Sequence, residues 1–334
     1  MEWEKGFCRS RIQPDTNCDK CGADPGRRWP IPSPQFPEDP RRMPVNLPLQ
    51  RCIPLLACLP LLAACEAQLD VDLTDGPIDG AESVVLHLTG IQLLREDGNR
   101  VTLDLDREVD LLQYRNGSTL RLVEGEEVPA ARYVGAHLVF AEDGSYVGRS
   151  DGSQVPVVPP ETQEFADLDL DVGDDDEASL LLDLELRFSL DDQLSTYGNY
   201  ALAPVLRALD PEDAGEVSGK VANALVEDAD CRQGRSLLRG VSVYAYEGTG
   251  VTPVDYARSR VSGTQPVSAT AVYDDGDGGY RYRFAFLPEG DYTLALTCNA
   301  DNEQPAVVND LDFQQRRNVT VDAGETRSIA FTAE

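Results

Sequence analysis

The chain has 334 residues, with 59 Asp and Glu against 29 Lys and Arg, which gives a formal net charge of −30. A chain this acidic offers no basic face to neutralise phosphates, so the composition excludes a nucleic-acid-binding protein. Two histidines in the whole chain disfavour most histidine-based metal sites and acid–base catalysis. The hydrophobic share of 41% is enough for ordinary cores, and the length allows about two domains.

Residues 1–42 show no hydrophobic periodicity from which secondary structure can be predicted. They contain both tryptophans of the chain, Trp3 and Trp29, together with many prolines. Met43 is the only methionine after Met1, and translation from it would produce a signal peptide of ordinary length. We therefore expect residues 1–42 to be a disordered extension that is not translated.

Residues 43–64 have the pattern of a signal peptide. Arg51 precedes an apolar run over 53–64, which at about 12 residues is too short to span a bilayer as a helix. The run ends in Leu62-Ala63-Ala64-Cys65, which resembles a bacterial lipobox. The resemblance implies that Cys65 receives diacylglycerol on its sulfur and becomes the first residue of the mature protein. A plain secretory signal, or a buried apolar segment with a chance cysteine, is the alternative.

The same resemblance bears on localisation. Cys65 would open a short lipid-anchored linker over 65–68. The next residue, Glu66, is not the Asp that retains many enterobacterial lipoproteins in the inner membrane. We therefore expect a lipid-anchored protein of the bacterial outer membrane, facing the periplasm or the cell surface.

From residue 69 to residue 209 the sequence has the period of β-strands. Leu69, Val71 and Leu73 alternate with aspartates, so they should share one face of a strand. Similar apolar runs follow at 84–94, 101–105, 120–123, 133–140, 155–158, 165–172 and 180–190, separated by turn residues such as Asp97-Gly98-Asn99. The segment 108–114 fits a helical turn as well as a strand. Many short strands without a long amphipathic helix predict an antiparallel β-sandwich over 69–209.

A second all-β unit is expected after a polar segment rich in proline and glycine. That segment, 210–215, predicts a linker. Apolar runs then follow at 217–226, 241–246, 270–273, 280–286, 292–297, 318–321 and 328–331. The fold class expected from the sequence is therefore all-β, with two antiparallel β-sandwich domains (Ig-like or transthyretin-like), each long enough to bury its own core.

Motifs in the first unit carry a family resemblance. They include Leu73-Thr-Asp-Gly-Pro-Ile-Asp-Gly80, Leu182-Asp-Leu-Glu-Leu-Arg-Phe-Ser189 and Tyr200-Ala-Leu-Ala-Pro-Val-Leu206. On these motifs residues 69–209 resemble domain-of-unknown-function family 4382, which is found in exported bacterial lipoproteins. The family has no assigned activity, so the resemblance implies architecture and location but no chemistry.

The second unit carries a different resemblance. Its motif is Gly279-Tyr-Arg-Tyr-Arg-Phe-Ala-Phe-Leu-Pro-Glu-Gly-Asp-Tyr-Thr-Leu294, an aromatic strand that leads through a Leu-Pro-x-Gly turn into a second strand. On this motif residues 216–334 resemble the carboxypeptidase regulatory-like (transthyretin-like) β-sandwich, sometimes grouped with carbohydrate-binding-like folds. One face of the first strand should hold its alternate aromatic residues, Tyr280, Tyr282, Phe284 and Phe286.

After Cys65 the chain contains only two cysteines, Cys231 and Cys298. An exported protein meets an oxidising compartment, so we expect these two thiols to form a disulfide. In the chain-entropy model this crosslink would contribute roughly 4 kcal/mol. Two separately buried thiols are the alternative.

Candidate chemistry is sparse. The sequence has no His-Glu-x-x-His motif and no phosphate-binding glycine loop. His87 and His137 fall inside expected strands, where a polar strand position is a simpler explanation than a catalytic triad. Paired carboxylates are expected by chance at this acidity, so no catalytic residue is assigned.

Calcium is the one specific metal hypothesis. Asp274, Asp275 and Asp277 lie among glycines and would offer hard oxygen ligands. The segment lacks the spacing of an EF-hand loop, and 174–177 is a second acidic cluster without internal glycines. The alternative for both is an acidic hairpin tip whose Asp and Gly residues make the turn.

Together these features predict a lipid-anchored cell-envelope protein with a non-enzymatic binding, adhesion or structural role. Its expected partners are the membrane, through the lipid on Cys65, and a surface polysaccharide or an envelope protein. One alternative is a calcium-dependent carbohydrate or surface-polymer binder. Its stacking platform would come from the available tyrosines, Tyr244, Tyr246, Tyr256 and Tyr273. The other is a hydrolase that uses two carboxylates.

Overall fold

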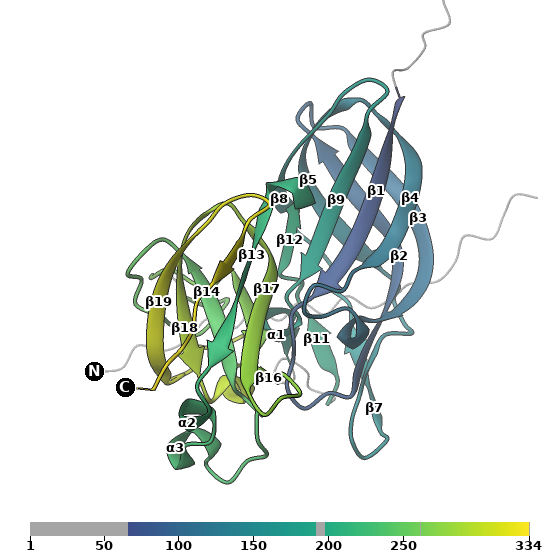
Figure 1. Ribbon diagram of the computed structural model, residues 1–334. Coiled ribbons are helices and arrows are strands. Elements are labelled where there is room, and N and C mark those ends of the chain that lie inside the picture. The colour runs from purple at the N-terminus through teal and green to yellow at the C-terminus, as the bar shows by residue number, and fades with distance from the viewer. Residues whose placement is uncertain (1–65, 192–197, 261, 334) are drawn as a thin grey trace, which may run out of the picture. The chain divides into compact units, whose positions relative to one another are not determined.

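The computed structural model describes residues 66–191, 198–260 and 262–333 (Figure 1). They belong to one compact unit, Leu61–Glu334. The expectations for residues 1–42, for the signal peptide over 43–64 and for Cys65 lie outside the described residues. Within the part described, no helix has the length and apolar character needed to cross a bilayer.

Two sheets pack face to face over residues 66–209. The four-stranded sheet has the order β12-β9-β1-β4, with β1 (Glu66–Asp75), β4 (Leu120–Pro129), β9 (Glu177–Leu184) and β12 (Leu206–Leu209). The eight-stranded sheet contains β2 (Ser83–Arg95), β3 (Arg100–Asp110), β5 (Ala131–Phe140), β6 (Tyr146–Gly148), β7 (Gln154–Val158), β8 (Ala166–Val172), β10 (Leu190–Asp191) and β11 (Tyr200–Leu202). Apolar residues from both sheets form one core. We call this part the first sandwich.

Strand β1 shows how the sequence period sets this packing. Leu69, Val71 and Leu73 are fully buried in the core, as their alternation predicts. Asp70 and Asp72 point outward, where both carboxylates pair with Arg121 of β4.

Residues 214–328 form two further four-stranded sheets. One has the order β16-β17-β13-β20, with β13 (Ala214–Val221), β16 (Tyr273–Asp274), β17 (Tyr280–Pro288) and β20 (Thr326–Ser328). The other has the order β15-β14-β18-β19, with β14 (Ser242–Glu247), β15 (Ser268–Ala271), β18 (Gly290–Thr297) and β19 (Phe313–Val321). Their shared core includes Val217, Val243, Tyr282 and Leu294. We call this part the second sandwich; its resemblance to the carboxypeptidase regulatory-like sandwich stays a prediction.

The expected all-β, sandwich-type fold is confirmed, and most strand pairs are antiparallel. However, β1 pairs with β9 in parallel, as do β7 with β11 and β13 with β20. A hairpin can join only antiparallel neighbours, and the strands of these pairs are far apart in the chain. The hydrophobic period reports which face of a strand is buried and carries no information on strand direction.

Short helices interrupt two of the expected strands. The pattern predicts one strand over 180–190, but β9 ends at Leu184 and a helical turn, α1 (Leu186–Ser189), follows. All residues from 180 to 191 are buried, so the alternation that would distinguish strand from helix is missing. The predicted strand over 217–226 likewise ends at Val221 and is followed by α2 (Asn223–Val226).

Both segments expected as linkers are part of the fold. Within 65–68, Ala67 is buried and pairs with β4, and the backbone N–H of Gln68 donates to the carbonyl of Asp176 at 2.8 Å. Within 210–215, a 3₁₀ turn (Pro211–Asp213) leads directly into β13. The ambiguous segment 108–114 divides at Asp110, where β3 ends and a 3₁₀ turn (Leu111–Gln113) begins.

A bulge in the second sandwich turns one predicted core residue outward. Tyr280, Tyr282 and Phe284 share the buried face of β17, as expected. The pairing of β13 with β17 shifts register between Gly215 and Val217, and beyond this point Leu287 takes the core position. Phe286 therefore packs instead beside Leu181 and Leu209 of the first sandwich.

Candidate functional site

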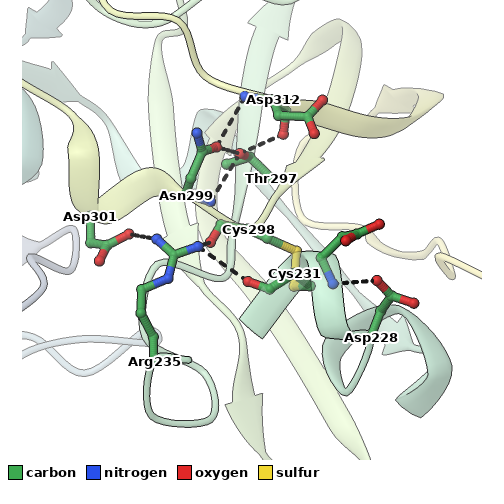
Figure 2. The surroundings of a disulfide bond; sticks show 9 residues. Asp228, Cys231, Arg235, Thr297, Cys298, Asn299, Asp301 and Asp312 are labelled. Atoms are coloured by element: carbon green, nitrogen blue, oxygen red, sulfur yellow. Dashed lines mark hydrogen bonds and ion pairs between the residues drawn. A yellow bond between two sulfur atoms is a disulfide. The ribbon is translucent and has the colours of Figure 1, made fainter. Parts of the chain in front are cut away.

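The predicted disulfide is present. Cys231 of α3 (Ala229–Arg232) is bonded to Cys298, which directly follows β18, and both are buried. Figure 2 shows Arg235 beside the bond, donating to the carbonyls of Cys231 and Cys298 at 3.2 and 2.9 Å and pairing with Asp301. The disulfide and Arg235 together hold the α2–α3 segment against the second sandwich.

The aspartates proposed as calcium ligands form a hairpin tip. Asp274 accepts the backbone N–H of Gly276 at 2.8 Å, and Asp275 accepts those of Asp277 and Gly279 at 3.0 and 2.9 Å. These backbone hydrogen bonds lower the pKa of Asp275. No group of three or more metal-ligating side chains is found in the described ranges. Calcium binding at Asp274, Asp275 and Asp277 stays a prediction, and their observed contacts are those of a turn.

The two histidines lie in strands, as expected. His87 of β2 places Nε2 2.8 Å from Asp106 of β3, and this hydrogen bond raises the pKa of His87. The hydroxyl of Ser145 accepts the backbone N–H of His87 at 3.0 Å. Serine, imidazole and carboxylate are thus close together, but the serine is bonded to the backbone rather than to the ring, unlike a catalytic triad.

The tyrosines considered as a sugar-stacking platform are largely core residues. Tyr244 and Tyr246 are fully buried, and their hydroxyls donate to Glu303 (2.9 Å) and to the carbonyl of Val254 (2.5 Å). Tyr256 stacks on buried Phe188 at a centroid distance of 4.6 Å. A stacking platform needs an exposed ring face, so Tyr244 and Tyr246 do not provide one.

The most unusual chemical feature is a buried group of charges between the two sandwiches, which the sequence does not reveal. It consists of Asp75, Asp183, Glu185 and Arg207, and we call it the junction cluster. The three acids are 6%, 7% and 1% exposed. Arg207 of β12 pairs with Asp183, lies 3.7 Å from Glu185, and donates to the carbonyl of Phe286 in the second sandwich at 2.9 Å.

One guanidinium cannot neutralise three buried carboxylates. Burial and the neighbouring acids raise the pKa of Asp75 well above its ordinary range, and they raise the pKa of Glu185 to about 8. Asp75 Oδ2 and Glu185 Oε1 are buried without a hydrogen-bond partner in the described part. The other oxygen of Glu185 accepts the backbone N–H of Ala269 in β15 at 3.2 Å. Burial thus favours the protonated forms of Asp75 and Glu185 within a cluster that bridges the sandwiches.

A cavity of about 30 Å³ adjoins the junction cluster. This volume suits a water molecule or two and is far below the several hundred Å³ of a small-molecule site. Carboxyl groups with raised pKa values are typical of glycosidases, but a hydrolase also needs room for its substrate. The junction cluster has carboxyl groups with raised pKa values, as active sites do, but the cavity beside it is too small for a substrate.

Arg187 of α1 forms a second buried link between the sandwiches. It is 4% exposed, pairs with Asp79 at 2.9 Å, and donates to the carbonyl of Ala300 (2.8 Å) and the hydroxyl of Ser242 (3.2 Å). Arg258 reaches in the opposite direction, from the second sandwich to the carbonyl of Phe188 at 3.0 Å. Removing one partner of such a buried pair is strongly destabilising, so these contacts fix the two sandwiches together.

The comparisons with known proteins agree with part of this picture. Residues 66–204 match the family model described as domain of unknown function (DUF4382), which confirms the resemblance found in the sequence. The match begins where β1 begins. No curated protein matches the chain.

Solved structures give only remote likenesses. The TIE protein of Bacillus anthracis is 11% identical, with a TM-score of 0.19, over 80% of this chain and 34% of that one. A leucine-rich repeat protein of Bacteroides thetaiotaomicron is 12% identical, with a TM-score of 0.19, over 80% and 27%. A candidate cell adhesion protein of Bacteroides fragilis is 8% identical, with a TM-score of 0.19, over 79% and 92%. The chain thus spans about a third or less of the first two structures, and TM-scores this low do not establish a shared fold or function.

Proposed function

We propose that this protein is anchored to the bacterial cell envelope by a lipid on Cys65, and that its two sandwiches act together as a non-enzymatic binding or structural module. The partners proposed are the membrane, through the lipid, and a polymer or protein of the envelope. Outer-membrane localisation is part of the same proposal.

The observation that supports the anchor is the position of strand β1 relative to Cys65. Strand β1 begins at Glu66, the residue directly after Cys65. Cleavage before Cys65 would therefore leave every described strand intact. It would also leave almost no tether, since Ala67 is already buried in the core of the first sandwich. The lipid would hold the first sandwich close to the membrane surface.

The non-enzymatic role is supported by the use of the charged side chains. Arg187, Arg207 and Arg258 are committed to contacts between the sandwiches, and the carboxyls with raised pKa values adjoin a cavity too small for a substrate. Such contacts suit a module that must keep its two parts in a fixed relation while a partner binds elsewhere.

The anchor can be tested by expressing the full chain in a Gram-negative host supplied with an alkyne fatty acid. We expect labelling of the wild type, loss of labelling in Cys65→Ser, and retained labelling in Cys58→Ser. Cys58 is the matched control because it lies in the same apolar run, seven residues before the lipobox cysteine. An unlabelled wild type released as a soluble protein would refute the anchor. Peptides from residues 1–42 in the precursor made by the native organism from its own gene would refute the start at Met43.

A further inference from the structure

A groove of about 490 Å³ lies beside the C-terminal end of β5 in the eight-stranded sheet. Its lining comes from Gln92 of β2, from the end of β5 together with Glu142, and from segment 158–163, which forms a wall. The volume falls within the range of about 300–1,000 Å³ that is usual for binding sites, unlike the cavity at the junction cluster. We call this feature the β5 groove.

The β5 groove marks a gap in the sheet. Strand β5 pairs with β2 over 133–140 but with β8 only over 131–136, so its last four residues have no described strand on the side of β8. Strand β7 ends at Val158 and β8 begins at Ala166. The two residues after Val158 are prolines, whose missing N–H groups cannot extend a ladder. Among the described residues, no backbone hydrogen bond joins 159–165 to β5.

The backbone of Phe140 faces this gap. The N–H of Ala141, the next residue, donates to the carbonyl of His87 in β2 at 2.9 Å. Peptide groups alternate in direction along a strand, so the N–H and C=O of Phe140 point away from β2. Phe140 is only partly buried, and neither group has a hydrogen-bond partner in the part of the chain that the structure describes. An unpaired strand edge of this kind can take up an extended peptide.

The side chains around the β5 groove are mostly apolar or acidic. Val158 is 48% exposed, and Phe140 lies beside it in the lining. Glu142, just after β5, and Glu161, in the wall, are exposed carboxylates. The described lining contains no lysine or arginine. The groove therefore attracts cations and repels anions, and the net charge of −30 adds to this preference.

His137 adds no positive charge to the groove. Its ring stacks on Phe165 with a centroid distance of 4.4 Å. Burial, followed by the nearby charge of Arg100, lowers the pKa of His137, so the ring is neutral at pH 7. Both ring nitrogens are buried, so the ring supplies packing surface and no hydrogen bond to an occupant of the groove.

We propose that the β5 groove binds an extended, basic peptide segment of a partner protein. Four residues of extended peptide span about 13 Å, which matches the unpaired end of β5. The backbone of the peptide would pair with Phe140, and its apolar side chains would contact Val158. Its lysine or arginine side chains would pair with Glu142 and Glu161.

This assignment gives a chemical class to the protein partner and rests on the binding role proposed above. It involves neither calcium nor the lipid on Cys65. Failure of the peptide to bind would therefore leave the anchor untouched, and loss of fatty-acid labelling would leave the groove untouched.

The probe is a short fluorescein-labelled peptide of alternating lysine and valine, and its binding to the purified protein is followed by fluorescence anisotropy. The protein is titrated to about 1 mM, which covers weak affinities. The buffer contains about 150 mM salt, which screens non-specific attraction beyond about 8 Å. We expect saturable binding of this peptide and none of a glutamate–valine peptide. A lysine–proline peptide keeps the charge but lacks N–H groups at alternate positions, and it should bind at least about tenfold more weakly.

Variants separate the groove from the general acidity of the surface. The double variant Glu142→Gln with Glu161→Gln should weaken binding about tenfold, since it removes both carboxylates of the lining. The matched control, Glu124→Gln with Glu126→Gln, removes the same charge from exposed positions of β4 and should change the affinity by less than about twofold. All four positions are exposed, so both proteins should fold.

Three results would overturn the proposal. They are the absence of saturable binding by the lysine–valine peptide, equal binding of the lysine–proline peptide, and equal losses in the two double variants. The last result would mean that the peptide responds only to net charge.

Discussion

Replacing Glu185 with glutamine should change how the stability of the protein depends on pH. In the folded state burial, followed by the charge of Asp183, raises the pKa of Glu185 from about 4.5 to about 8. Between these two values the folded protein keeps a proton that the unfolded chain has released. Stability contributed by the neutral carboxyl is therefore fully present below pH 4.5 and is lost as the pH rises toward 8.

The magnitude follows from the two pKa values. Each pKa unit corresponds to about 1.4 kcal/mol, so ionisation of Glu185 in the folded protein costs at most ~5 kcal/mol. Glutamine has the same shape and keeps an oxygen that can accept the N–H of Ala269, but it does not ionise. We expect Glu185→Gln to become progressively more stable than the wild type above pH 5, by about 1.4 kcal/mol per pH unit.

The assay is urea unfolding of both proteins from pH 5 to pH 8.5, followed by circular dichroism. The quantity compared is the difference between variant and wild type, because Glu303, whose pKa burial raises to about 7, titrates in both. Glu126→Gln, at an exposed position of β4, is the control and should give a difference that is constant with pH. A constant difference for Glu185→Gln as well would refute the reasoning, since it would mean that Glu185 is ionised in the folded protein.

Three further predictions concern other parts of the fold. In an NMR pH titration His87 should titrate above 6.5 and His137 below it, and a reversed order would contradict the contacts described for each ring. Replacing Cys231 and Cys298 together by alanine should lower the free energy of unfolding by roughly 4 kcal/mol, since the bond closes a loop of 67 residues; a loss below about 1 kcal/mol in urea unfolding would contradict this account. Gly219→Ala should destabilise the protein by about 1–3 kcal/mol, because its Cβ would lie 1.7 Å from the carbonyl oxygen of Ile329. An unchanged melting temperature would show that Ile329, directly after β20, can move away.

The sequence predicts the first sandwich well where one face of a strand meets water. Leu69, Val71 and Leu73 alternate with aspartates, as expected for a strand with one buried and one solvent-exposed face, and all three are buried. Cys231 and Cys298 could be paired because they are the only cysteines after Cys65. The strand period is visible within a few consecutive residues, and the disulfide pairing follows because no third cysteine is available after Cys65.

The junction cluster could not be predicted, for a physical reason. Asp183, Glu185 and Arg187 alternate with leucines, which normally indicates a strand with a solvated face, yet all three are buried. Their partners come from distant parts of the chain, such as Arg207 and Ala269. Nothing within the segment 180–190 indicates that a second sandwich will cover it.

The position of β1 has a consequence for the order in which the protein matures. Its partners, β4 and β9, extend to Pro129 and Leu184, so this strand cannot complete its pairing until more than a hundred further residues have been synthesised. A chain exported from its N-terminal end would thus present β1 before its partner strands have emerged. Under the proposed anchor, topology rather than a flexible tether gives the modifying enzymes time to act before the fold closes over that end.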